Sequence, residues 1–119
     1  MFIIDCKIYP FQIMVYFGKN KKPLCKELAK YKGLAKSSIR GLKEGKTIMF
    51  PTGQTLIWLK RKPQSINDLA ILNHEIFHCT CFILNRCGIQ MSKKSDEAFA
   101  YLIQYLTEQI YNELDITFS

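Results

Sequence analysis

The hydrophobic and polar positions in the first half of the chain predict short strands and one short helix. Residues 2–17 are rich in Ile, Val, Tyr and Phe and contain Pro10 near their middle, which is typical of two short strands or of one bent edge strand. Residues 23–31 carry apolar side chains at helical spacing and predict a short amphipathic helix. The β-prone runs 46–50 and 55–60 are separated by a turn-forming Pro-Thr-Gly-Gln segment, which predicts a hairpin.

In the second half of the chain the apolar residues recur at helical spacing instead. Ser65 suits the N-cap of a long helix, because apolar side chains recur at helical spacing from there until Gly88. A second long helix is predicted to begin at Ser92 or Ser95 and to run to about Leu114. We therefore expect an α+β fold, in which a small antiparallel or mixed sheet is followed by two long helices.

Length and composition indicate one soluble domain. A chain of 119 residues has room for a single core, so we expect residues 1–119 to form one domain. Hydrophobic residues make up 48% and charged residues 23%, which is ordinary for a globular protein. The apolar stretch 2–17 is too short to span a bilayer and does not read as a signal peptide. We expect no membrane partner and a cytoplasmic location, and the sequence leaves the oligomeric state open.

Cysteine usage and charge add two expectations. The five cysteines form an odd set with no CxxC pair, which favours reduced thiols. The net charge of +7 is unevenly placed, since residues 1–63 hold 14 Lys and Arg against 3 Asp and Glu, whereas residues 64–119 hold 3 against 7. A basic half can bind nucleic acid or another anionic partner, but it contains no nucleic-acid motif, so we favour a solvated lysine-rich surface.

The most informative segment is an HExxH motif on the first long predicted helix. Its residues are His74, Glu75, Ile76, Phe77 and His78. Side chains four positions apart share one helical face, so both imidazoles can bind the same metal ion while the glutamate projects beside them. The alternative is that both histidines are ordinary helix residues. Because imidazole and carboxylate ligands suit Zn²⁺, the pattern favours a zinc site.

A third ligand is required for catalysis, and Glu97 follows His78 by 19 positions at the start of the second long helix. Through NHEIFH at 73–78 and DEAFAY at 96–101, the sequence resembles the gluzincin metallopeptidases, in which an HExxH helix is followed by a helix that supplies a glutamate ligand. The resemblance covers about residues 65–110. It implies a minimal zincin-like fold with zinc held by His74, His78 and Glu97, and Asp96 is the alternative to Glu97. The chain is also similar to small bacteriophage proteins described as zinc peptidases, which would place it in the bacterial host cytoplasm.

Two further side chains carry alternative interpretations. Tyr101 stands where the thermolysin pattern has an aspartate, one turn after the glutamate, and its hydroxyl is either a catalytic group that supports the oxyanion or part of the core. Cys81 lies three residues after His78 and could complete a closed His-His-Cys structural zinc site, although a buried free thiol is the commoner role.

The resemblance implies a zinc-dependent peptidase that acts on a peptide or protein substrate. Glu75 would accept the proton of the attacking water and pass it to the leaving amine. The strand at 55–59 would pair with the extended substrate. Two alternatives stay open, namely a non-catalytic zinc-stabilised binding protein that contacts a phage or host partner or nucleic acid, and a zinc-free packing module.

Overall fold

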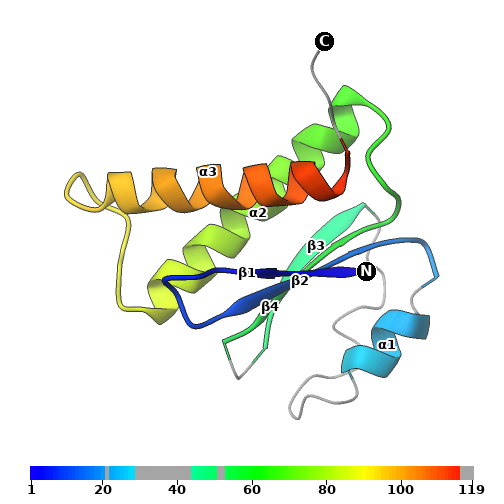
Figure 1. The fold of residues 1–119 in the computed structure, drawn as a ribbon, viewed down its shortest axis with the longest axis horizontal. Coiled ribbons are helices and arrows are strands. Elements are labelled where there is room, and N and C mark those ends of the chain that lie inside the picture. Colours follow the sequence, from blue (N-terminus) through cyan, green and yellow to red (C-terminus); the bar gives the residue numbers. More distant parts are fainter. Residues whose placement is uncertain (21, 29–43, 51–52, 116–119) are drawn as a thin grey trace.

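The computed structural model describes residues 1–20, 22–28, 44–50 and 53–115. In chain order the elements are β1 (Phe2–Asp5), β2 (Gln12–Phe17), α1 (Lys22–Leu28), β3 (Gly45–Met49), β4 (Thr55–Leu59), α2 (Ile66–Arg86) and α3 (Asp96–Glu113) (Figure 1). The predicted α+β class is confirmed. The short helix predicted for 23–31 is observed up to Leu28, and the remainder of that prediction lies outside the described residues.

The four strands form one mixed sheet in the order β1-β2-β4-β3. Pro10 lies in the turn between β1 and β2, so the two-strand reading of residues 2–17 is the correct one. β3 and β4 form the predicted antiparallel hairpin, and β4 joins β2 in parallel. The parallel pairing brings together strands that are separated by α1 and β3 in the sequence.

Strand β4 lies inside the sheet, and all five of its residues are buried. It pairs with β2 along one edge and with β3 along the other. The prediction that this strand pairs with a substrate is therefore wrong, because both of its hydrogen-bonding edges are already used. The edge strands are β1 and β3.

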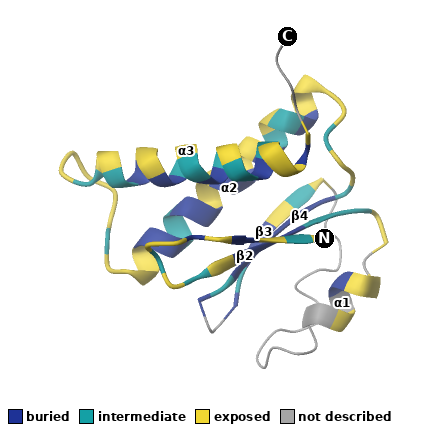
Figure 2. Ribbon diagram, in the orientation of Figure 1, coloured by how far each residue is buried: buried dark blue, intermediate teal, exposed yellow. Residues whose placement is uncertain are grey.

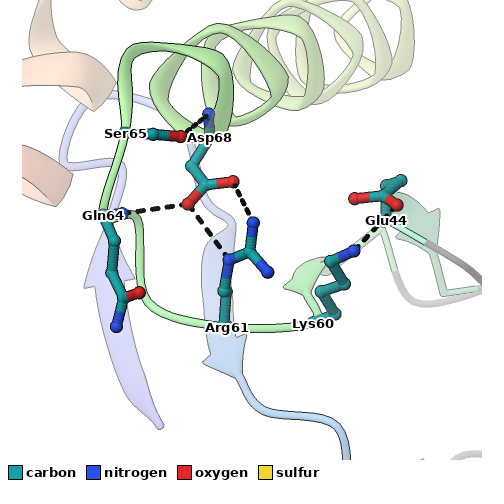
Figure 3. A network of polar contacts seen from close by, with 6 residues as sticks. All are labelled: Glu44, Lys60, Arg61, Gln64, Ser65 and Asp68. Carbon is teal, nitrogen blue, oxygen red and sulfur yellow. Dashed lines mark hydrogen bonds and ion pairs between the residues drawn. The ribbon is translucent and has the colours of Figure 1, made fainter.

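The two long helices begin and end close to their predicted bounds. Ser65 caps α2, since its Oγ accepts a hydrogen bond from the backbone N–H of Asp68 at 3.1 Å. The carboxylate of Asp68 in turn accepts hydrogen bonds from Arg61 and from the backbone N–H of Gln64 (Figure 3). α3 starts after Ser95, one of the two positions at which this helix was predicted to begin.

Both long helices pack on the same face of the sheet. Their exposed residues lie mainly on the sides that face away from the strands (Figure 2). The main core lies between sheet and helices and includes Ile57, Ile76 and Leu106, each at most 1% exposed. A smaller cluster on the opposite face joins Leu24 of α1 to Trp58 of β4. Within the described ranges, no helix combines the length and apolar character needed to cross a membrane.

Candidate metal centre

The two histidines of the chain lie side by side on the exposed face of α2. Their Nε2 atoms are 3.0 Å apart, and the ring centroids are separated by 4.6 Å in an edge-to-face arrangement. Two nitrogen ligands of a tetrahedral zinc ion, each about 2.0–2.1 Å from the metal, lie about 3.3 Å from one another. His74 and His78 therefore fit a shared metal ion with a displacement of only a few tenths of an ångström.

Glu75, next to His74 in the sequence, packs against the sheet and is only 6% exposed. The hydroxyl of Thr47, on the edge strand β3, lies 2.7 Å from Glu75 Oε1 and 3.0 Å from the backbone carbonyl oxygen of Glu75. Adjacent helical positions differ by about 100°, which allows the glutamate to contact the sheet while the neighbouring histidine faces solvent.

A recess separates this part of α2 from β3. One cavity of about 300 Å³ is lined by Gly45, Lys46, Thr47, His74, Glu75, His78 and Phe82. A second cavity of about 380 Å³ shares Gly45, His74 and Glu75 and adds Glu44, whose carboxylate is paired with Lys60 at 2.8 Å. In the described part of the sheet the outer edge of β3 pairs with no strand. The recess thus brings together two imidazoles, the carboxylates of Glu75 and Glu44, and the outer edge of β3.

The structure does not bring Glu97 to the two histidines. Among the described residues, no three His, Cys, Asp or Glu side chains form a group that could hold a metal ion. The hydroxyl of Tyr111 donates a hydrogen bond to Asn73 Oδ1 at 2.9 Å, so the last turns of α3 lie beside the motif. Glu97 lies 14 residues earlier, about 21 Å along the helix axis. Both Glu97 and the alternative Asp96 are exposed in the first turn of α3.

Tyr101 also lies away from the histidines. Its side chain is 67% exposed, so it is not a core residue. It lines a separate apolar cavity of about 360 Å³ between α3 and the turn that joins β1 to β2, together with Cys6, Lys7, Ile8, Tyr9, Ala98, Leu102 and Tyr105. No residue of that cavity lines the recess at Glu75. The structure therefore gives Tyr101 a different neighbourhood from the one expected of an oxyanion donor.

Cys81 has the surroundings of a packing residue. Its side chain is half-buried against the main core, and burial raises the pKa of its thiol. Cys6, Cys79, Cys81 and Cys87 are free thiols, in agreement with the expectation of reduced cysteines for the part of the chain that is described.

Sequence reasoning missed Thr47 and Glu44. Both belong to the region of β3, which the hairpin pattern did identify. The pattern did not show which strand residues would face α2, because that depends on how the helix crosses the sheet. Alternation along β3 places Thr47 on the helix side and Ile48 in the opposite cluster.

No protein-family model, curated protein or solved structure matches this chain. The functional assignment therefore depends on the side chains described above.

Proposed function

We propose that this protein is a zinc-dependent peptidase whose reaction is centred on His74, Glu75 and His78. The observation that carries the proposal is the convergence of the two imidazole Nε2 atoms, 3.0 Å apart, beside a buried carboxylate on the same helical turn. When bound, zinc would supply polarisation of the scissile carbonyl and would acidify the attacking water. Glu75 would accept the proton of that water and transfer it to the nitrogen of the leaving amine.

The outer edge of β3 is the proposed place for the peptide backbone. A peptide in extended conformation can add to an unpaired strand edge through main-chain hydrogen bonds, which hold it without requiring a particular sequence. Within the described strands β3 satisfies this condition, and it also lines the recess that contains Glu75. The proposed substrate is therefore a peptide or an extended segment of a protein.

Glu97 is the proposed third zinc ligand, on the strength of the gluzincin resemblance. Its side chain is exposed in the first turn of α3. Ligation by Glu97 requires the first turn of α3 to lie closer to His78 than it does in this structure. Glu44, like Glu75, lines a cavity together with His74.

The Glu75→Gln variant tests the proposed reaction. The amide keeps the size of the side chain but cannot accept the proton, so peptide hydrolysis should fall by a factor of about 10² or more while zinc content persists. Glu108→Gln, at an exposed position of α3, is the matched control and should keep wild-type activity. Equal activity in the Glu75 variant would refute the assigned role, and loss of its zinc would make Glu75 a ligand instead.

A further inference from the structure

Thr47 is a buried polar side chain, 5% exposed, whose only described hydrogen bonds go to one residue. Its hydroxyl has a single proton and two acceptors within reach, both belonging to Glu75. The carboxylate oxygen is the closer acceptor, at 2.7 Å against 3.0 Å for the backbone carbonyl. The shorter distance assigns the hydroxyl proton to the hydrogen bond with Oε1.

The backbone carbonyl of Glu75 has another donor in any case. It lies inside α2, where the N–H four residues later satisfies it. The carboxylate has no such second partner among the described residues. Thr47 is therefore the described side chain that fixes where the end of Glu75 lies, and it leaves the second carboxylate oxygen free.

We infer that Thr47 is the positioning residue for Glu75, an inference that rests on the proposed peptidase function. A glutamate side chain has several rotatable bonds, and a general base must lie within hydrogen-bond distance of the proton it takes. Threonine suits this task because its β-branch restricts χ1 and so directs the hydroxyl. The hydroxyl comes from the edge strand that lines the recess, so the same strand that would hold the peptide also aligns the carboxylate.

Three variants separate positioning from packing. Thr47→Val replaces the hydroxyl with a methyl group of similar size, whereas Thr47→Ser keeps the hydroxyl. Thr80→Val is the matched control, because Thr80 is also a buried threonine. It lies on α2 and its hydroxyl donates to the Ile76 carbonyl at 2.9 Å, away from the recess. All three variants are compared with wild type at equal zinc occupancy, after their folding has been verified by thermal melting.

Positioning predicts a kinetic difference between the variants. In Thr47→Val, kcat should fall by about 10- to 100-fold with little change in KM, since a misaligned base slows the chemical step rather than substrate binding. Thr47→Ser should recover most of kcat, and Thr80→Val should match wild type. A wild-type kcat in Thr47→Val, or an equal loss in Thr47→Ser, would overturn the inference.

A second readout needs neither zinc nor turnover. In the zinc-free protein, side-chain NMR coupling constants of Glu75 should indicate one rotamer in wild type, Thr47→Ser and Thr80→Val, and averaging over several rotamers in Thr47→Val. A single Glu75 rotamer in Thr47→Val would contradict the inference whatever the activity. If the wild-type protein hydrolyses no peptide, the proposed function fails, while the couplings still decide whether Thr47 fixes Glu75.

Discussion

Arg61 holds Asp68 through two hydrogen bonds of 3.1 Å, from Nε to one carboxylate oxygen and from a terminal nitrogen to the other (Figure 3). Arg61 lies two residues after the end of β4, and Asp68 lies in the first turn of α2. The contact therefore fixes how the helix that carries the histidines leaves the sheet.

Acid should weaken this contact. The pKa of Asp68 is lowered mainly by the hydrogen bond from Arg61 and then by the hydrogen bond from the backbone N–H of Gln64. Together these effects outweigh burial, which alone would raise the pKa. Because the folded-state pKa lies below the unfolded value of about 3.9, the stabilisation is complete above about pH 4 and is lost as the pH falls through the lowered pKa. The Asp68→Asn variant should melt at a lower temperature than wild type near neutral pH, and the difference should shrink in acid.

The matched control is Asp96→Asn, at an exposed aspartate in the first turn of α3. Thermal unfolding followed by circular dichroism across a pH series measures both variants. A melting-temperature difference for Asp68→Asn that stays constant down to strongly acidic pH would show that the Arg61 contact does not stabilise the fold.

The third zinc ligand can be identified by comparing three alanine variants. If Glu97 is the ligand, Glu97→Ala should lower zinc affinity by a factor on the order of 10² or more, since one of three protein ligands is lost. Cys81→Ala should retain zinc, and the lost packing should lower the free energy of unfolding by on the order of 1 kcal/mol. Titration of the metal-free proteins with zinc gives the affinities.

Other results from the alanine variants would assign the third zinc ligand to a residue other than Glu97. If Glu44→Ala loses zinc and Glu97→Ala retains it, the third ligand is Glu44. This residue directly precedes β3 and lines a cavity with His74. A sulfur shell near 2.3 Å in X-ray absorption, with loss of zinc in Cys81→Ala, would indicate a closed structural site and would contradict the peptidase proposal.

The thiols should react in an order set by burial. Burial, followed by the charge of Asp5, raises the pKa of Cys6 to about 12, and burial also raises the pKa of Cys79. Cys87 is exposed. Because the thiolate is the reactive form, iodoacetamide should modify Cys87 first and Cys6 and Cys79 last in the folded protein. Peptide mapping by mass spectrometry measures the order, and early modification of Cys6 would show that this side chain is not buried.

Much of the fold could be predicted because its signals are local. The N-cap at Ser65, the apolar period of α2 and the turn before β4 each depend on residues close together in the sequence. The four-residue spacing of His74 and His78 brings them together on any helix. These parts of the prediction did not require knowledge of the tertiary structure.

The parts that sequence reasoning missed depend on contacts between distant residues. The parallel pairing of β2 with β4 decides that β3 is the edge strand, and nothing near Thr55 in the sequence indicates it. The hydrogen bond between Thr47 and Glu75 joins residues that are 28 positions apart in the sequence, and it depends on how α2 crosses the sheet. The place of Glu97 depends on the path of the chain between α2 and α3, which hydrophobic periodicity does not define.

The zinc content of the purified protein tests the central claim most directly. Elemental mass spectrometry after dialysis against a weak chelator should find about one zinc per chain in wild type, and much less in His74→Ala and in His78→Ala, since each variant removes one of the two converging imidazoles. The Tyr111→Phe variant, which removes the hydroxyl that contacts Asn73 on the same helix, should keep its zinc. A folded wild-type protein that contains no zinc and takes up none when it is added would contradict the account.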